Sequence, residues 1–337
     1  MTQTRTRGTG GLGGRHRSRS LLIAAAVVAA LATTSVLSAF HTRLEPIDPQ
    51  GPDAASEVVG PEIVGIRTFT PPAGLRVAAD LEYGTREDGT LLTLDVCLPP
   101  AVGLGLDLPA VVSVHGGSWA RGDKANADWR NVCLWLASEG FVAASVNYRL
   151  VPDAVFPAQL EDVQLAVEWL RDPEQVERFD LDPARIGVFG GSAGGNLAAL
   201  VGADGEGSLD EGSRVAAVVD LSGPVVLDGI AEGEEWLRGI VGAYLACDPD
   251  TLDTTGCPAA APASPGTLAD ASDPPVFIGH AEQEIIPLVQ SLGYAESLRA
   301  AGVPVELAVV PGGEHSIGIL DAGLRERVAA FLHAQLG

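Results

Sequence analysis

The sequence predicts an α/β fold, in which a mostly parallel sheet of about eight strands is covered by helices on both faces. Two observations predict it. From about Leu81 onward, short apolar segments alternate with longer segments whose apolar residues recur at helical spacing. In addition, a glycine-rich turn at residues 190–195 lies directly between a strand-like and a helix-like segment. In such folds the functional groups lie at the carboxyl ends of the strands, so the residues after each strand matter most.

The expected elements follow one another in this alternating order. Residues 159–171 illustrate the helical pattern, because Leu160, Val163 and Val167 fall on one helical face. The expected strands are residues 91–98, 110–114, 141–146, 185–189, 215–221, 275–278 and 305–310. The expected helices are residues 129–138, 159–171, 289–300 and 321–335, with a further helix of small residues after residue 195. The short insertion at residues 227–271 predicts a small partial lid.

The N-terminal region departs from this globular pattern. Residues 1–20 contain five arginines and no acidic residue, and an apolar run from Leu21 to about Phe40 follows. A basic flank before an apolar segment is the layout of an export signal, with a small-x-small cleavage site at residues 30–32. The run at residues 21–40 is also long enough to span a bilayer, so an uncleaved membrane anchor is the alternative. We therefore divide the chain into an export signal or anchor (1–40), a Pro- and Gly-rich linker (41–65) and a catalytic domain (66–337).

Net charge limits the possible partners, and cysteine content agrees with an extracytoplasmic protein. The formal net charge of −23 excludes nucleic acid as a partner and argues against a polyanionic substrate. Cys247 and Cys257 lie in one polar loop and predict a disulfide, which is favoured outside the cytoplasm. For Cys97 and Cys133, a second bridge and two buried thiols are both open. The cysteine spacings do not resemble a zinc site, so no metal is expected.

Residues 190–194 read Gly-Gly-Ser-Ala-Gly, a G-x-S-x-G motif between a strand and a helix. This context predicts a strained turn that raises the Ser192 hydroxyl above the sheet edge. The flanking glycines allow close backbone packing, and the helix start favours negative charge. Ser192 is therefore the expected nucleophile of an acyl transfer.

A second glycine-rich turn, His-Gly-Gly-Ser-Trp at residues 115–119, follows the strand at 110–114. Acyl transfer passes through a tetrahedral oxyanion, which requires backbone N–H groups aimed at it. The candidates are the amides of Gly116, Gly117 and Ser118, together with that of Ala193 directly after the nucleophile.

His315 is the expected base. It lies between the last strand and the last helix, which agrees with the chain order nucleophile, acid, histidine. His280, at the end of the strand at 275–278, is the competing histidine. We expect His280 and Trp119 to line the substrate pocket instead.

At this point the chain resembles the hormone-sensitive-lipase-like and feruloyl-esterase-like branches of the α/β-hydrolase family. The resemblance covers about residues 80–335 and implies a carboxylesterase fold, a Ser–His–acid triad and no cofactor. The matching segments are residues 115–119, 122–124, 147–150, 156–162, 182–186, 190–195, 264–265 and 310–316.

The triad acid is where the chain departs from these relatives. They carry the acid four residues before a proline, and here that proline matches Pro287, which assigns the position to Gln283. Glutamine accepts a hydrogen bond but carries no charge. The neighbours Glu282 and Glu284 are the favoured substitutes, Asp220 is a more distant one, and an incomplete triad stays open.

These residues predict a serine carboxylesterase that hydrolyses small or short-chain esters through an acyl-enzyme on Ser192. Two alternatives remain. One is an amidase or formamidase of the same fold. The other is a catalytically weak surface binding protein on a hydrolase scaffold, which an incomplete triad would explain.

Overall fold

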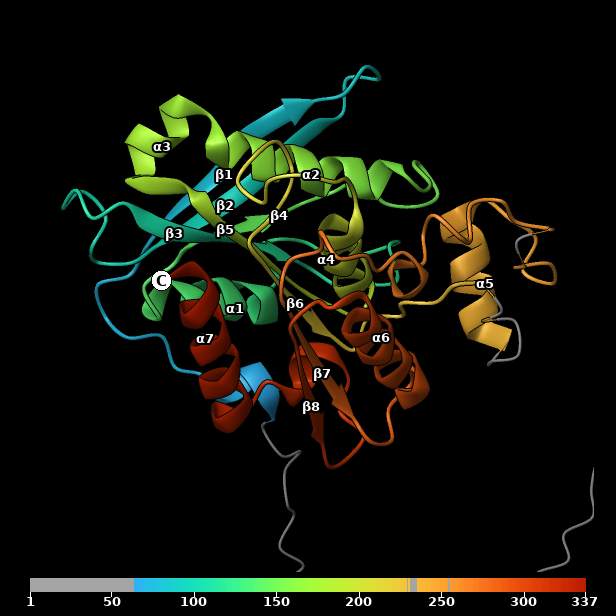
Figure 1. The fold of residues 1–337 in the computed structure, drawn as a ribbon. Coiled ribbons are helices and arrows are strands. Elements are labelled where there is room, and N and C mark those ends of the chain that lie inside the picture. The colour runs from blue at the N-terminus through green and yellow to red at the C-terminus, as the bar shows by residue number, and fades with distance from the viewer. Residues whose placement is uncertain (1–63, 229, 231–234, 254) are drawn as a thin grey trace, which may run out of the picture. The chain divides into compact units, whose positions relative to one another are not determined.

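The computed structural model describes residues 64–228, 230, 235–253 and 255–337. The predicted export signal (1–40) and nearly all of the predicted linker (41–65) lie outside these residues. Eight strands form one sheet in the order β1-β2-β4-β3-β5-β6-β7-β8. Strands β3 to β8 run parallel, whereas β2 pairs antiparallel with both β1 and β4. The predicted fold class is confirmed (Figure 1).

The central parallel strands β3, β4, β6 and β7 are short and completely buried, as expected for a sheet covered on both faces. Strand β3, for example, is buried at every position of its apolar run LPAVVSV. The strands are β1 (Arg76–Thr85), β2 (Leu91–Leu98), β3 (Leu108–Val114), β4 (Val142–Val146), β5 (Leu181–Gly191), β6 (Ala217–Leu221), β7 (Val276–Ala281) and β8 (Val305–Val310).

The helices divide between the two faces of the sheet. Helices α2, α4 and α6 pack on one apolar cluster, and α1 and α7 pack on the other. The helices are α1 (Ala127–Ser138), α2 (Ala158–Arg171), α3 (Pro173–Phe179), α4 (Ala193–Ala203), α5 (Glu235–Leu245), α6 (Leu288–Ala301) and α7 (Ala322–Leu336). Three 3-10 turns complete the named elements: η1 (Gly65–Thr68), η3 (Pro265–Thr267) and η4 (Ser316–Ile319).

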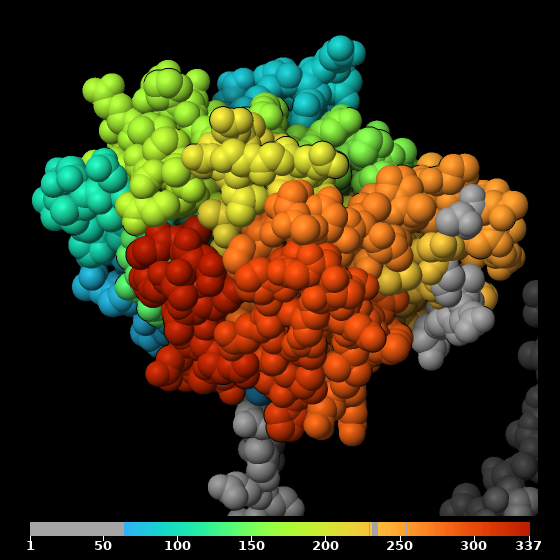
Figure 2. Space-filling view, in the orientation of Figure 1, coloured from blue at the N-terminus to red at the C-terminus, as the bar shows by residue number. Residues whose placement is uncertain are grey.

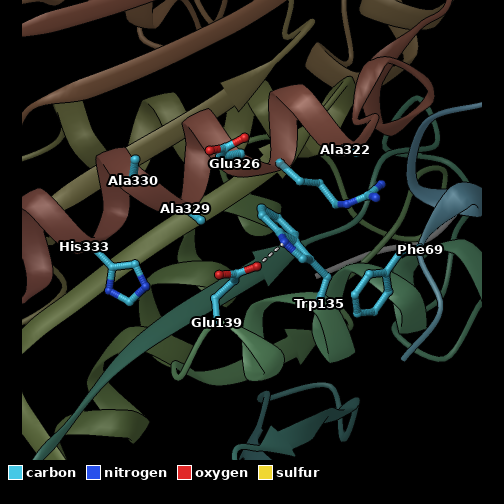
Figure 3. A pocket seen from close by; sticks show the side chains of 9 residues that line it. Phe69, Trp135, Glu139, Ala322, Glu326, Ala329, Ala330 and His333 are labelled. Carbon is cyan, nitrogen blue, oxygen red and sulfur yellow. Dashed lines mark hydrogen bonds between the residues drawn. The ribbon is translucent and has the colours of Figure 1, made fainter. Parts of the chain in front are cut away.

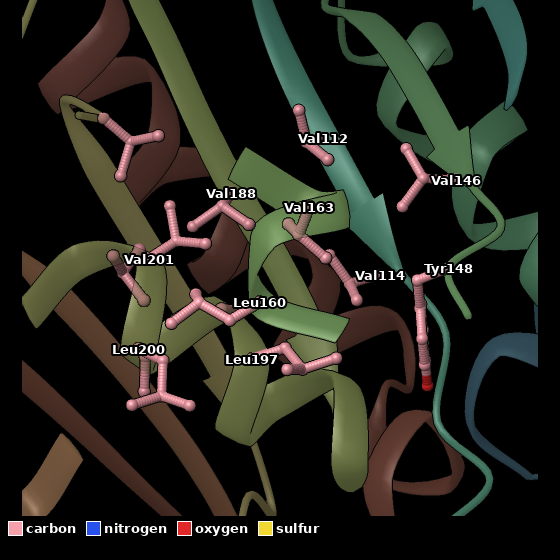
Figure 4. Packing of buried hydrophobic residues seen from close by; sticks show 14 of the residues in the cluster. Val112, Val114, Val146, Tyr148, Leu160, Val163, Val188, Leu197, Leu200 and Val201 are labelled. Atoms are coloured by element: carbon pink, nitrogen blue, oxygen red, sulfur yellow. The ribbon is translucent and has the colours of Figure 1, made fainter. Parts of the chain in front are cut away.

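Branched side chains fill the space between the sheet and its helices. Val112 and Val188 of the central strands face Val163 of α2 and Leu197 of α4 (Figure 4). These side chains are fully buried, and burying each contributes about 1.5–3 kcal/mol to stability. In the space-filling view, the orange and red residues from β7 to α7 occupy the lower part of the visible face (Figure 2). The strand ends that carry the functional residues therefore have a rigid support.

Three elements were not expected from the sequence. Strand β1 is mostly exposed, so its sequence lacks the apolar alternation that marks a buried strand. Helix α3 has only seven residues, and its start depends on the Asp172 side chain, which accepts from the Glu174 amide. Helix α5 lies inside the segment that we assigned to a partial lid.

Both pairs of cysteines form disulfides. Cys247–Cys257 closes the polar loop after α5, as expected. Cys97–Cys133 joins β2 to α1, which decides between the two alternatives left open for that pair. Among the residues that the structure describes, no helix is both long and apolar enough to cross a membrane.

Candidate active site

The predicted site residues come together at the carboxyl ends of four parallel strands, β3, β5, β7 and β8. Ser192 follows β5, and the turn at residues 115–119 follows β3. Glu284 lies on the loop after β7, and His315 lies on the loop after β8. Because these strands run parallel, residues far apart in the sequence meet at one edge of the sheet.

Ser192 occupies a sharp turn between β5 and α4. Its backbone has φ 59° and ψ −126°, a combination that non-glycine residues rarely adopt. The turn needs glycine at two positions, since a Cβ on Gly190 would meet the Gly194 carbonyl oxygen at 1.9 Å. A Cβ on Gly194 would likewise meet the Val114 carbonyl oxygen at 2.1 Å. The Ser192 side chain makes no capping hydrogen bond to α4, so its hydroxyl stays available for reaction.

The turn after β3 presses directly against this serine. A Cβ on Gly116 would lie 2.8 Å from the Gly191 carbonyl oxygen and 3.1 Å from the Ser192 Cβ. Among the described residues, no group accepts a hydrogen bond from the amides of Gly117, Ser118 or Ala193. These three N–H groups are therefore free to bind an oxyanion.

His115 holds the turn in this conformation. Its ring stacks on Tyr148 at a centroid distance of 4.4 Å, and its Nδ1 lies 2.8 Å from the Gly116 carbonyl oxygen. The Tyr148 hydroxyl donates to the His115 carbonyl oxygen at 2.9 Å. Burial lowers the pKa of His115, and the hydrogen bond to Gly116 opposes that effect only in part. His115 is thus a neutral structural residue of the turn.

His315 lies beside the serine turn through its neighbour Ser316. A Cβ on Gly191 would meet the Ser316 Oγ at 2.2 Å, and the Ser316 amide donates to the Ser222 hydroxyl at 3.0 Å. The Nδ1 atom of His315 contacts Oε2 of Glu284. Its Nε2 atom is buried and has no hydrogen-bond partner in the described part of the chain. One ring nitrogen is thus held by a carboxylate while the other is free to exchange a proton.

The structure distinguishes the three candidates for the acid. The side chain of Glu284 is completely buried against His315, whereas Glu282 and Gln283 are exposed. The reason is the backbone pairing after β7. The amides of Glu282 and Gln283 still donate to the Val310 and Gly312 carbonyl oxygens, both at 3.0 Å. Only at Glu284 does the chain leave this pairing, so counting back from Pro287 selected the wrong residue.

Glu284 is held as a carboxylate by its neighbours. Burial alone would raise the pKa of Glu284, but hydrogen bonds involving His280, His315 and Ser222 outweigh that effect and lower it. A carboxylate on Nδ1 fixes the ring orientation of His315 and stabilises its protonated form. The arrangement can therefore support general-base chemistry at Ser192.

His280 does not line the substrate pocket, contrary to our expectation. Its side chain is fully buried behind Glu284, with Nε2 lying 2.9 Å from Oε1 of that residue. Its Nδ1 lies 2.8 Å from the Ser291 hydroxyl of α6. The last three residues of β7 are still paired with β8, and this pairing keeps His280 inside the sheet layer.

A small, mostly apolar pocket opens beside Ser192. It measures about 280 Å³ including its mouth. Trp119 lines it, as predicted, and stacks on Tyr244 of α5 at a centroid distance of 4.0 Å. The lining residues are Ser118, Trp119, Ser192, Ala193, Pro224, Trp236, Leu237, Ile240, Ile285 and Ile286.

Several of these wall residues escaped the sequence analysis. Leu237 and Ile240 belong to α5, and Ile285 and Ile286 follow Glu284 on the loop after β7. The helical spacing of residues 237, 240 and 241 was the available signal, because it marks an apolar helix face in the insertion. Ser222, which contacts the His315 loop, carries no such signal.

A second hollow lies away from Ser192, between α1 and α7. Trp135 of α1 and Glu139, the residue directly after α1, face Ala329 and His333 of α7 across it (Figure 3). The indole N–H of Trp135 donates to Glu139 at 3.2 Å. None of its lining residues belongs to the site described above, so it contributes nothing to the chemistry at Ser192.

Comparisons with known proteins agree with this geometry. Residues 94–298, well over half of the chain, match the BD-FAE family. Carboxylesterase NlhH from Mycobacterium tuberculosis (strain ATCC 25618 / H37Rv) is 33% identical over 260 residues, which cover 73% of this chain and 77% of that protein. Arylacetamide deacetylase from Bos taurus is 45% identical over 89 residues, or 26% of this chain. The chain spans only 22% of the length of that bovine protein.

Solved structures share the fold. A truncated carbohydrate esterase from gut microbiota superposes with a TM-score of 0.65 at 24% sequence identity. The match covers 77% of this chain and 96% of that chain. At this level of identity the likeness concerns the architecture alone.

Proposed function

Because this chain belongs to the BD-FAE family, a branch of the α/β-hydrolases, we propose that it is a serine carboxylesterase. The single observation that carries the proposal is the arrangement around His315. Its Nδ1 contacts the buried carboxylate of Glu284, and its Nε2 has no hydrogen-bond partner among the described residues. The next residue, Ser316, lies against Gly191 of the serine turn. The similarity to a carboxylesterase over most of the chain supports the same reaction.

The proposed reaction is a two-step acyl transfer. His315 Nε2 takes the proton of the Ser192 hydroxyl as Oγ attacks the ester carbonyl carbon. The amides of Gly117, Ser118 and Ala193 bind the oxyanion that forms. The tetrahedral intermediate then collapses, and His315 gives its proton to the departing alcohol oxygen. Water, deprotonated by the same ring, attacks the acyl-enzyme and releases the acid.

Glu284 contributes to both steps through His315. Its negative charge stabilises the imidazolium that exists while the proton is on the ring. Its contact with Nδ1 also fixes the tautomer in which Nε2 is the proton acceptor. Glu284 itself keeps its charge throughout the cycle.

The pocket supports a small acyl group. The enclosed volume of the pocket is only about 30 Å³, far below the range of about 300–1,000 Å³ that holds drug-sized ligands. Leu237 and Ile286 in its wall are nearly inaccessible to solvent and packed into the core. We infer that the enzyme accepts acetyl to short-chain acyl groups and rejects long chains.

We also propose that the protein acts outside the cytoplasm. The basic and apolar segments of residues 1–40 support export, either with cleavage or with residues 21–40 kept as an anchor. The disulfides Cys97–Cys133 and Cys247–Cys257 support it as well, because such bonds persist in oxidising compartments. A fusion of residues 1–45 to a reporter that is active only after export would test it, and an inactive reporter would contradict it.

Hydrolysis of a p-nitrophenyl acyl series, from acetate to palmitate, tests the esterase. We expect release of p-nitrophenol with a preference for the short chains, and no release by Ser192→Ala. A serine-reactive phosphonate should label Ser192 in the native chain. Ser208→Ala serves as the control, because Ser208 is exposed and lies beyond the C-terminal end of α4, whereas Ser192 lies at its start. A matched pair of ester and formamide separates the esterase from a formamidase. Absence of both labelling and hydrolysis would leave the binding-protein alternative.

A further inference from the structure

The carboxylate of Glu284 lies between two histidines, of which the proposed reaction uses only one. Oε2 contacts Nδ1 of His315, and Oε1 lies 2.9 Å from Nε2 of His280. The side chains of Glu284 and His280 are both completely buried. Among the described residues Oε1 accepts no well-aligned hydrogen bond, so its contact with the His280 ring is one of charge and proximity.

The surroundings of His280 fix which of its nitrogens carries the hydrogen. Nε2 lies 2.9 Å from the Ile286 carbonyl oxygen as well as 2.9 Å from the Glu284 carboxylate, and both groups only accept. Nε2 therefore carries a hydrogen, which is aimed at the Ile286 carbonyl. Nδ1 faces the Ser291 hydroxyl at 2.8 Å, and this hydroxyl both donates and accepts. The contact with Glu284 is thus preserved whether His280 is neutral or charged.

The charged groups around His280 come from two further segments. Asp220 lies on β6 and Glu284 on the loop after β7, and the Ile286 carbonyl oxygen is the third polar neighbour. Burial lowers the pKa of His280, but the neighbouring Glu284 carboxylate and the Ile286 carbonyl oxygen raise it by more, so the net shift is upward. Among the described residues, His315 and His280 are the two side chains next to Glu284 that can carry a positive charge.

Glu284 needs such a partner more than a shorter acid would. A glutamate has one more rotatable bond than an aspartate, so its carboxylate can take more positions relative to His315. His280 lies at the opposite oxygen and excludes the positions that turn Oε2 away from Nδ1. His280 is itself held by Ser291 and by the Ile286 backbone.

We propose that His280 is a positioning residue of this active site, which holds Glu284 so that Oε2 faces Nδ1 of His315. Ser291 extends the arrangement by fixing the ring of His280. The proposal rests on the esterase reaction proposed above, because Glu284 matters only if His315 is a base. His280 touches neither the substrate pocket nor Ser192 in the described residues.

A double-mutant cycle on the full chain tests this role. His280→Leu removes the ring nitrogens at similar volume, and we expect kcat to fall about 10²-fold with KM little changed, as for a small misplacement of a catalytic group. His280→Gln keeps an N–H near the Nε2 position and should restore most of the loss. In the Glu284→Gln background, His280→Leu should cost nothing further, because the group it positions is already inactive.

The outcomes separate the two proposals. Equal losses in both backgrounds, or native kcat in His280→Leu, would overturn the positioning role while leaving the esterase intact. Absence of Ser192-dependent hydrolysis in the native chain would overturn the esterase and this role together. If His280→Leu does not fold, Ser291→Ala replaces it, with an expected loss of about 10-fold from one hydrogen bond. That loss should also vanish in the Glu284→Gln background.

Discussion

The Oε2 atom of Glu284 contacts Nδ1 of His315 across 31 residues of sequence, from a side chain that is completely buried. The two residues after β7 that precede Glu284 are exposed and do not take part. This relationship determines which acidic residue on the loop affects activity, and it leads to the first prediction.

Glu284→Gln should lower kcat by about four orders of magnitude, the loss seen when a triad carboxylate becomes an amide. The amide removes the charge that stabilises protonated His315. Steady-state hydrolysis of p-nitrophenyl acetate measures the effect. Glu282→Gln is the matched control, and it should keep native activity because Glu282 is exposed. Gln283→Asp should bring no gain, and a large gain would show that Glu284 is not the functional acid.

Gly116→Ala should lower kcat about 10²–10³-fold, as expected when an oxyanion-hole donor is displaced. The new Cβ would lie 2.8 Å from the Gly191 carbonyl oxygen, so the turn after β3 has to move away from Ser192. The same assay, combined with a thermal melt, separates lost activity from lost folding. Gly293→Ala on α6 provides the control, because nothing lies within 4 Å of its Cβ. Native kcat in Gly116→Ala would mean that the turn does not hold the oxyanion.

Asp220→Asn should stabilise the protein at high pH and leave it unchanged at low pH. Complete burial raises the pKa of Asp220 from 3.8 to about 7 in the folded chain, although the Gly223 amide donates to it. Between these two values the folded chain binds a proton that the unfolded chain has lost, so the free energy of unfolding falls as the pH rises. The loss is complete above about pH 7. Asparagine removes this titration.

Thermal melts of Asp220→Asn and the native chain, from about pH 4 to about pH 8, measure this difference. The Tm of the variant relative to the native chain should rise up to about pH 7 and then level off. Asp250→Asn, at an exposed position, should show no such trend. A difference that is independent of pH would contradict the assignment of a buried, protonated Asp220.

Removing Cys97–Cys133 should destabilise the protein more than removing Cys247–Cys257. In the chain-entropy description, a bridge across 36 residues contributes about 4 kcal/mol and one across 10 residues about 3 kcal/mol. Cys97 and Cys133 are also buried in the core between β2 and α1. Urea unfolding of the two paired Cys→Ala variants gives the comparison. The reverse order of stabilities would refute it.

Much of the fold follows from the sequence because the buried strands are marked by composition. Strands β2 and β8 begin and end at the predicted residues, since each is a compact apolar segment bounded by Pro or Gly. Strand β1 could not be found in this way, because contacts with β2 rather than burial hold it. The boundaries of the helices differ from the predicted ones by only one or two residues, the usual uncertainty at helix ends.

The site was predictable where a motif fixes the backbone and unpredictable where only tertiary packing does. Residues 190–194 and 115–119 specify their turns locally, because their glycines are required by close backbone approach. The choice among Glu282, Gln283 and Glu284 depends on how far the loop pairs with β8, and no local pattern encodes that. The same holds for His280, whose burial follows from its position within β7.

The pocket walls and the reacting groups come from different parts of the chain. Helix α5 supplies Trp236, Leu237 and Ile240 to the pocket, but it contributes no atom to the proposed proton transfers. Its amphipathic sequence can therefore change to admit other acyl groups while the strand ends keep the same reaction. Exchanging α5 between relatives is therefore a direct way to alter the range of substrates. During evolution, substitutions in α5 can likewise change the substrate without changing the residues that carry out the reaction.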